Sequence, residues 1–267
     1  MQKLNLFSEA AKCLAVKEVE EKLILVQGLY QNWQAGKLRA ENPDKDLKLE
    51  CGIPVKPELV TLNKLKTRRV DTKEGHAALI HSIAHIEFSA INLALDALAR
   101  FRQMPQEYYA DWIRIADEER QHFMLLRQRL NKLGYDYGDF PAHGGLWRVA
   151  EETAKDVLLR MALVPRVLEA RGLDVTPGII DKFKVINDSE TVKILNRIFT
   201  DEITYVAAGN RWFRHVCDKR DLEPETAFIG IIKEEFKGKI KGPFAIEARL
   251  KAGFSKSELE QIKKLAG

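Results

Sequence analysis

The chain has 267 residues, of which 45% are hydrophobic and 31% are charged, a composition typical of soluble globular proteins with enough apolar side chains for a core. Its 43 Lys and Arg exceed its 39 Asp and Glu, and the resulting net charge of +4 is far from the clustered positive charge of a dedicated nucleic-acid-binding protein. Cys13, Cys51 and Cys217 are scattered without a CxxC pair, which argues against a disulfide framework or a zinc finger.

The sequence predicts neither a membrane span nor secretion. The longest mostly apolar stretch, residues 157–170, is interrupted by Arg160, Pro165 and Arg166, so we expect no helix that crosses a bilayer. The first 15 residues lack a sustained apolar segment and a cleavage site, which argues against a secretory signal. Together with the scattered cysteines, these features predict a cytoplasmic protein that does not associate with membranes.

The N-terminal 70 residues divide into a helix and an extended arm. Ser8 is the expected cap of a first helix that runs to about Gly36, because apolar residues recur at helical spacing over this stretch. Residues 37–70 contain three prolines, each of which lacks a backbone hydrogen-bond donor. We therefore expect residues 37–70 to form an extended arm that packs on the rest of the protein.

Four long helical segments follow, and they are predicted at residues 72–101, 105–133, 146–171 and 189–218. The first has capping-box spacing at Asp71 and Glu74. The second is followed by Gly134, which suits a left-handed exit from a helix. The third is expected to bend at Pro165 and to end at Gly172.

Shorter helical pieces complete the chain. One is expected to begin at Thr176-Pro177, and another begins at Pro224. The turn FKGKIKGPF (236–244) then leads into a small C-terminal helical tail, and the simplest interpretation of its lysines is a solvated face. The sequence thus predicts an all-α protein in three parts, at residues 1–70, 71–218 and 219–267, of which the middle part is a four-helix bundle.

Each long helical segment carries a glutamate on its apolar face. The four are Glu87, Glu119, Glu169 and Glu202, which lie at three-to-four-residue spacing from apolar neighbours. An ionised carboxylate is costly to bury unless a cation or strong hydrogen bonds compensate it. A multivalent cation is therefore the simplest explanation for four acids that converge in one core.

The spacing along the chain supports this convergence. Glu87 and Glu119 are equally far from the turn between their helices, so an antiparallel pair places them at one level. Glu202 lies roughly 20 Å into its helix, whereas Glu169 lies close to the predicted helix end. These two reach one level only if the 177–187 segment continues the direction of the third helix.

Two of the glutamates begin a motif with a second donor atom. An acid and a histidine at positions i and i+3 offer an oxygen and a nitrogen to the same metal, as in Glu119-x-x-His122. Glu202-x-x-Tyr205 occupies the equivalent place in the fourth segment but ends in a phenol. The pattern Glu, Glu-x-x-His, Glu and Glu-x-x-His, with one element on each long helix, is the di-iron carboxylate site of ferritin-like bundles.

Four strings around these residues are GHAALIHSIAHIEFSAINLALDALARF (75–101), EERQHFMLLRQRLNKLGYDYGDFPAHGGLW (118–147), MALVPRVLEARGLDVTPGII (161–180) and DEITYVAAGNRWF (201–213). They resemble a bacterial family of ferritin-like proteins of unknown function, over roughly residues 40–255. The resemblance implies a ferritin-like four-helix core, and it brings no known substrate. The metal ligands that it implies are Glu87, Glu119, His122, Glu169 and Glu202.

The sequence departs from this family at two positions. Relatives usually have histidine in place of Tyr205, and we expect histidine in many of them in place of Lys155. Tyr205 is either an ordinary half-buried tyrosine or a phenolate ligand to iron, with a radical or proton relay as a further role. Both departures leave open whether the protein binds two metal ions or one.

Simpler interpretations stand beside the metal site. The glutamates are also explained by buried salt bridges with Arg120, Arg166, Arg171 or Arg211. Glu118 is an alternative to Glu119, because it lies four residues from His122. His81 and His85 share a helix face, yet His85 lies roughly 200° around the helix from Glu87, so we expect His85 to point away from the cluster. We expect both histidines to lie either beside the metal ligands or at the surface.

The arrangement predicts an O₂-dependent oxidoreductase in which two ferrous ions, bridged by Glu119 and Glu202 and flanked by Glu87 and Glu169, activate dioxygen. Ferroxidase chemistry and hydroxylation of a small-molecule substrate both fit. The same ligands accept manganese or zinc. No segment resembles an RNA-binding motif, although a tRNA substrate stays open. A homodimer is compatible with the sequence. The alternative is a non-catalytic metal-binding or scaffold bundle whose site is degenerate because of Tyr205.

Overall fold

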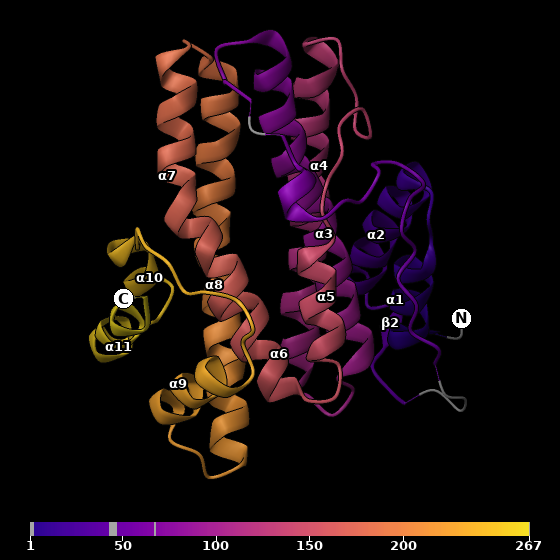
Figure 1. Ribbon diagram of the computed structural model, residues 1–267. Coiled ribbons are helices and arrows are strands. Elements are labelled where there is room, and N and C mark those ends of the chain that lie inside the picture. Colours follow the sequence, from indigo (N-terminus) through magenta and orange to yellow (C-terminus); the bar gives the residue numbers. More distant parts are fainter. Residues whose placement is uncertain (1–2, 43–46, 67, 267) are drawn as a thin grey trace. The chain divides into compact units, whose positions relative to one another are not determined.

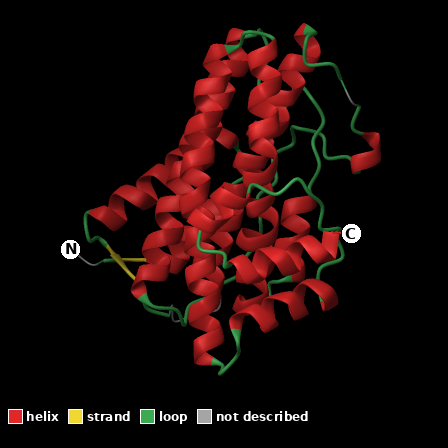
Figure 2. Cartoon of the chain, turned by 90° about the vertical axis from the view of Figure 1, so that its left-hand side faces the viewer, coloured by secondary structure: helices red, strands yellow, loops and turns green. Residues whose placement is uncertain are grey.

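The computed structural model describes residues 3–42, 47–66 and 68–266. The described chain is mostly helical (Figures 1 and 2), which confirms the predicted all-α class. It divides into two compact units, residues 1–148 (unit 1) and residues 149–267 (unit 2). The three-part division at residues 70 and 218 stays a prediction.

Unit 1 begins with two helices where the sequence predicted one. α1 (Leu6–Ala15) is capped by Asn5, whose side chain accepts a hydrogen bond from the Ser8 amide at 3.0 Å. The chain is extended at Val16 before α2 (Val19–Gln34) begins. The predicted single helix with Ser8 as its cap is therefore wrong, because the apolar spacing runs through the break without marking it.

Tertiary hydrogen bonds stabilise the break between α1 and α2. The Leu14 carbonyl accepts from the Gly52 amide and from the Lys22 ammonium, both at 2.9 Å. The Lys22 ammonium is buried and also donates to the Asn92 side-chain oxygen at 2.6 Å. Since Gly52 and Asn92 come from distant parts of the chain, no local pattern in the sequence could indicate this break.

The segment after α2 is largely irregular, as predicted for an extended arm. Two short strands, β1 (Leu4–Asn5) and β2 (Leu38–Arg39), pair in parallel, with Leu4 opposite Leu38. Figure 2 shows this pair beside the N-terminal end of the chain. A single 3-10 turn, η1 (Leu62–Lys64), is the remaining element in the described part of the arm.

Two long antiparallel helices form the main part of unit 1. α3 (Lys73–Arg100) and α4 (Gln106–Lys132) contact each other along their lengths. The cap of α3 is Thr72 instead of the predicted Asp71, because Asp71 instead accepts from Arg69. Gly134 has a φ of 83° and ends α4 in the left-handed conformation, as predicted.

α3 is the one described helix whose length and composition would allow it to cross a membrane, a property that the sequence prediction overlooked. However, 67% of its apolar window is buried inside the protein. This degree of burial is typical of a core helix in a soluble globular protein.

Unit 2 contains the second pair of long helices. α5 (Gly145–Glu152) spans the boundary between the units, and it is followed by α6 (Val157–Leu163), a π-helix η2 (Val164–Glu169), α7 (Ala170–Val185) and α8 (Ser189–Lys219). α7 and α8 lie side by side (Figure 1). The single helix predicted over residues 146–171 is wrong, because the chain leaves the helix at 153–156 between α5 and α6. At Pro165, where a bend was predicted, the chain forms the π-helix, a conformation that is frequent at functional sites.

The predicted helix end at Gly172 and the predicted new start at Thr176-Pro177 are both wrong, because α7 passes through these residues. Gly172 does not adopt a positive φ, and nothing lies within 4 Å of the position that its Cβ would take. It therefore acts as an ordinary helical residue, and the chain passes from η2 into α7 without a break.

Three shorter helices complete unit 2: α9 (Pro224–Glu234), α10 (Ile246–Lys251) and α11 (Lys256–Ala266). The predicted helix start at Pro224 is confirmed, and the predicted C-terminal tail consists of α10 and α11. The basic turn 236–244 connects α9 to α10.

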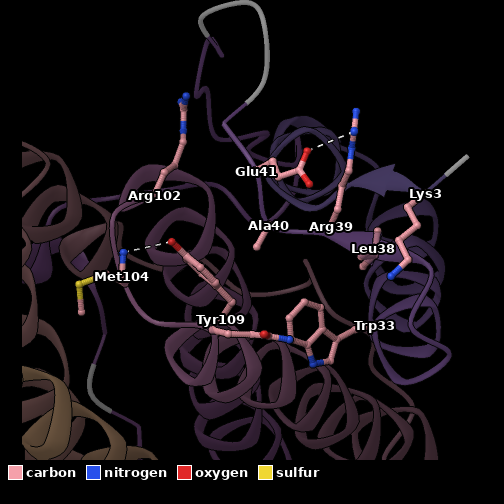
Figure 3. A pocket seen from close by; sticks show the side chains of 10 residues that line it. Lys3, Trp33, Leu38, Arg39, Ala40, Glu41, Arg102, Met104 and Tyr109 are labelled. Carbon is pink, nitrogen blue, oxygen red and sulfur yellow. Dashed lines mark hydrogen bonds and ion pairs between the residues drawn. The ribbon is translucent and has the colours of Figure 1, made fainter.

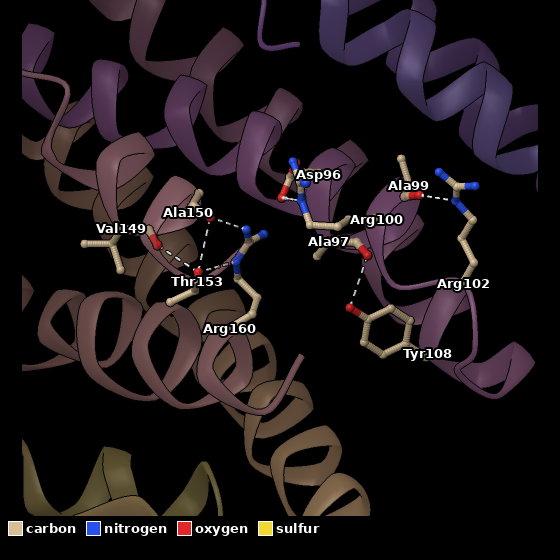
Figure 4. A network of polar contacts seen from close by, with 10 residues as sticks. All are labelled: Asp96, Ala97, Ala99, Arg100, Arg102, Tyr108, Val149, Ala150, Thr153 and Arg160. Carbon is tan, nitrogen blue, oxygen red and sulfur yellow. Dashed lines mark hydrogen bonds and ion pairs between the residues drawn. The ribbon is translucent and has the colours of Figure 1, made fainter. Parts of the chain in front are cut away.

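Buried polar contacts hold the ends of several helices (Figure 4). In unit 2, the fully buried Arg160 donates to the Thr153 hydroxyl at 2.7 Å and to the Ala150 carbonyl at 2.5 Å, which ties α6 to the end of α5. In unit 1, the Tyr108 hydroxyl of α4 donates to the Ala97 carbonyl of α3 at 3.2 Å. The Arg160 bond reaches a carbonyl group at the end of α5, where a helix lacks backbone donors, whereas the Ala97 carbonyl also accepts from the Phe101 amide at 3.3 Å.

Candidate metal centre

The turn between α3 and α4 sets the level of the first two glutamates. Glu87 and Glu119 are each 16 residues from Gln103, in the middle of that turn. Both side chains face the interior, where Glu87 is 3% exposed and Glu119 is 2% exposed. The prediction that this antiparallel pair places the two acids together is confirmed.

His122 completes a group of three donors in unit 1. Its Nδ1 atom lies 3.2 Å from a carboxylate oxygen of Glu87 and 3.6 Å from one of Glu119. One donor atom from each residue lies within 4.8 Å of the other two, and all three side chains are buried. The Nδ1 atom of His122 is therefore the nitrogen that faces both acids.

The geometry of this group fits a single metal ion. Donor atoms about 2.1 Å from one ion lie roughly 3 to 4 Å from each other, and the distances from His122 Nδ1 fall in that range. Two carboxylates and an imidazole, without a thiolate, suit divalent iron, manganese or zinc. The same group is the one metal-ligand cluster of three or more His, Cys, Asp or Glu found among the described residues.

Three of the four arginines named as salt-bridge partners are engaged elsewhere. Arg120 donates to Asp117 at 2.7 Å, Arg166 pairs with Glu258, and Arg171 donates to the carbonyls of the 241–243 loop. The salt-bridge explanation therefore loses these three partners. Asp117 is a buried acid that the sequence prediction did not consider as a partner of Arg120, and it also accepts from Gln121 at 2.9 Å. Its spacing of three residues from Arg120 and four from Gln121 could have indicated both contacts.

A close contact between two helices sets the register in unit 2. Pro165 of η2 and Gly209 of α8 are each 22 residues from Asn187, which has a φ of 58° in the turn between α7 and α8. A Cβ atom on Gly209 would lie only 2.2 Å from the Pro165 Cβ. The two backbones thus meet at these residues, and residues equally far from Asn187 lie at one level.

This register places the second set of predicted ligands. Glu169 and Tyr205 are each 18 residues from Asn187, so they lie level, and Glu202 lies about 5 Å further along the axis. Glu202 and Tyr205 are buried on α8, whereas Glu169, at the end of η2, is partly exposed. Residues 177–185 belong to α7, which follows η2 without a break, and the sequence required such a helical segment between Glu169 and the turn.

The competing residues lie outside the cluster in unit 1. Glu118 pairs with Arg114 at 2.5 Å, and its side chain is 29% exposed. His81 stacks on Tyr137, and His85 Nδ1 lies 2.9 Å from the Tyr137 hydroxyl. Neither histidine joins Glu87, as expected for His85, because both face the aromatic layer around Tyr137.

His81 makes the stability of unit 1 sensitive to acid. Its Nε2 accepts from the Gly138 amide at 2.9 Å, and burial lowers the pKa of His81 to about 4. The unfolded chain binds this proton near pH 6.5, so the free energy of unfolding is expected to fall by roughly 3 kcal/mol as the pH drops from 6.5 to 4. Urea denaturation at several pH values should show a smaller acid loss for His81→Gln, and an unchanged loss would contradict the assignment.

A hollow on unit 1 was not predicted from the sequence (Figure 3). It has a volume of about 620 Å³, and Trp33, Tyr109 and the cations Lys3, Arg39 and Arg102 lie around it. The Tyr109 hydroxyl accepts from the Met104 amide, and Arg39 pairs with Glu41. The hollow contains none of the predicted metal ligands, so it is separate from the cluster in unit 1.

Comparison with known proteins places the chain in a family. A family model described as "Protein of unknown function (DUF455)" matches residues 15–260. The chain belongs to this family. It is also 41% identical over 270 residues to an uncharacterized protein of Haemophilus influenzae (strain ATCC 51907 / DSM 11121 / KW20 / Rd), and the match covers 96% of this chain and 93% of the relative. No solved structure matches the chain.

Proposed function

We propose that this member of the DUF455 family is an iron-dependent oxidoreductase that activates dioxygen, with ferrous iron or a small organic molecule as its substrate. The observation that carries the proposal is the buried group of Glu87, Glu119 and His122, whose donor atoms lie within 4.8 Å of one another. We also propose membership of the ferritin-like superfamily. In each of the two pairs of helical segments, the first segment carries a glutamate and the second carries Glu-x-x-His or Glu-x-x-Tyr, which is the order of ligands in ferritin-like bundles.

The protein's own residues would hold the ion and set its surroundings. Glu87 and Glu119 would neutralise a divalent charge, and His122 would add a neutral nitrogen through Nδ1. Burial of all three side chains keeps bulk water away and strengthens the electrostatic interaction. Iron bound there would supply the electrons that reduce dioxygen.

The second set of ligands determines how many ions bind. Glu169, Glu202 and Tyr205 repeat the order of the first set, with tyrosine in the place of histidine. A phenol is a weaker ligand for ferrous iron than an imidazole unless it loses its proton. We therefore expect one tightly bound ion, held by the unit 1 set, and a second ion that binds more weakly.

Metal content and oxygen consumption test this function together. Protein isolated from iron-replete cells is expected to contain between one and two irons per chain, and the metal-free protein should consume oxygen when ferrous iron is added. Tyr205→His should raise the iron content to two per chain, because it restores an imidazole. Elemental analysis and an oxygen electrode provide both measurements.

The two outcomes separate the leading function from its alternative. A protein that binds zinc or no metal, and that consumes no oxygen with ferrous iron, would be a scaffold or a metal-binding bundle without catalysis. Iron binding without oxygen consumption would support the proposed metal site and contradict the proposed oxidoreductase activity.

A further inference from the structure

Unit 2 contains a cavity that is separate from the metal ligands. It has a volume of about 180 Å³ and lies against η2, the start of α7, α9 and the basic turn 236–244. Its apolar walls come from Phe228, Ile232, Phe236, Phe244 and Ile262. An engineered cavity of about 150 Å³ with such walls holds benzene, so this cavity has room for one ring or a short branched chain.

Arg166 supplies a buried cation to this cavity. Its side chain lines the cavity and is 1% exposed. The guanidinium carbon lies 3.7 Å from the ring centre of Phe228 and 4.2 Å from that of Phe213. One terminal nitrogen donates to Glu258, but Nε and Nη1 are buried without a hydrogen-bond partner.

Such a group is costly in a folded protein. A buried donor without an acceptor destabilises the structure by about 1–3 kcal/mol, and more if it is charged. Burial also lowers the pKa of Arg166 to about 10, because removal from water disfavours the charged form, and the contact with Glu258 offsets part of this effect. Glu258 already compensates the charge of Arg166, and an anion in the cavity would provide the acceptors that Nε and Nη1 lack.

The charged side chains around the cavity, Arg166 included, also favour an anion. Five cationic side chains line it, against the single acid Asp174. Asp174 is already engaged, because its two oxygens accept from Arg249 at 2.6 and 2.9 Å. Lys239 and Lys241 are exposed at the rim of the cavity, so the positive charge extends from the interior to the entrance.

Arg171 holds the entrance in shape. Its guanidinium donates to the carbonyls of Lys241 at 2.8 Å and Pro243 at 3.1 Å. These bonds fix the turn that carries the two rim lysines beside the cavity. The basic turn, whose simplest sequence interpretation was a solvated face, therefore forms one wall of the cavity.

We propose that this cavity binds a small organic carboxylate with an apolar body, such as an aromatic or branched-chain acid. The carboxylate accepts from the free nitrogens of Arg166, the apolar body packs on the phenylalanine and isoleucine walls, and Lys239 and Lys241 attract the anion to the entrance. This binding does not depend on a metal ion.

Three small probe molecules, which differ in charge and in the presence of a ring, test the proposal on the full-length protein. Benzoate combines the charge with a ring, benzamide keeps the ring without the charge, and acetate keeps the charge without the ring. Isothermal titration and ligand-observed NMR are expected to give benzoate a Kd on the order of 1 mM or lower. Benzamide and acetate should each bind at least about tenfold more weakly.

Substitutions then locate the bound acid. Ile240→Trp places a large side chain at the cavity and should abolish benzoate binding, whereas Lys251→Gln, at an exposed lysine of α10 outside the cavity, should leave it unchanged. Arg166→Lys keeps a cation but has fewer donors in a different geometry, so it should weaken binding about tenfold. Since this buried arginine also supports the fold, circular dichroism must show that the variant is folded, and Ile240→Trp tests the site independently.

Three results would overturn the proposal. Benzoate that fails to bind, benzoate that binds no better than benzamide, or binding that survives Ile240→Trp would each show that the cavity is not an organic-acid site. Metal-free protein serves for every titration, so the result is independent of iron binding and of oxygen consumption.

Discussion

Glu119→Gln is expected to weaken binding of ferrous iron by at least about 100-fold. The amide removes a full negative charge from the group that faces His122 Nδ1 at 3.6 Å, and it leaves one neutral oxygen as a donor. Loss of residues that merely support metal ligands typically costs 10–100-fold in affinity, so loss of a ligand should cost at least as much. Anaerobic competition with a chromophoric chelator measures the change in Kd.

Glu118→Gln is the matched control for this substitution. Glu118 is the neighbouring residue on α4, has the same chemistry and pairs with Arg114 near the surface. Its substitution should change the iron Kd by less than about threefold, because surface ion pairs contribute little. Equal effects of the two substitutions would mean that the buried group is not the iron site. A destabilised Glu119→Gln with unchanged iron affinity would favour a structural salt-bridge cluster.

The cluster of acids and histidine in unit 1 could be predicted because the positions of its residues depend on local spacing. Glu87 and Glu119 are related by one short turn, and the helical period places His122 on the same face as Glu119. Neither step requires a contact with a distant residue. The fold class was predictable for the same reason, since helical spacing of apolar residues extends over most of the chain.

The features that could not be predicted depend on distant partners. The break between α1 and α2 is stabilised by Gly52, which donates to the Leu14 carbonyl, and by Asn92, which accepts from Lys22, and both of these partners lie outside the broken segment. Arg166 was named only as a salt-bridge partner for the glutamates. Its partner Glu258 lies 92 residues away. The cavity beside Arg166 is formed by several segments, and the helical spacing of residues does not indicate which segments pack together.

Glycines show how the same residue type can mislead. A glycine after an amphipathic stretch predicts a helix end, and this rule holds for Gly134 but is wrong for Gly172. The difference is conformational, because Gly134 adopts a positive φ and Gly172 does not. Gly209, which the sequence did not single out, is required for a different reason, namely the close approach of Pro165.

Gly209→Ala is expected to lower the free energy of unfolding of the protein by about 3 kcal/mol. The added Cβ would lie 2.2 Å from the Pro165 Cβ and 2.5 Å from its Cγ, so α8 and η2 must move apart. Overpacking of this kind typically costs about 1–3 kcal/mol, and the proline ring has no flexible end that could turn aside. Urea denaturation followed by circular dichroism measures the loss.

Gly172→Ala is the matched control, and its effect should have the opposite sign. Because Gly172 is helical and nothing lies within 4 Å of its missing Cβ, alanine there should stabilise α7 by roughly 0.5–1 kcal/mol. Were Gly172 a left-handed helix end, alanine would instead destabilise the protein, and α7 could not continue from η2. The pair of substitutions therefore tests two features, the contact at Pro165 and the continuous helix that sets the level of Glu169 relative to Tyr205. Stabilisation by Gly209→Ala would contradict the first, and destabilisation by Gly172→Ala would contradict the second.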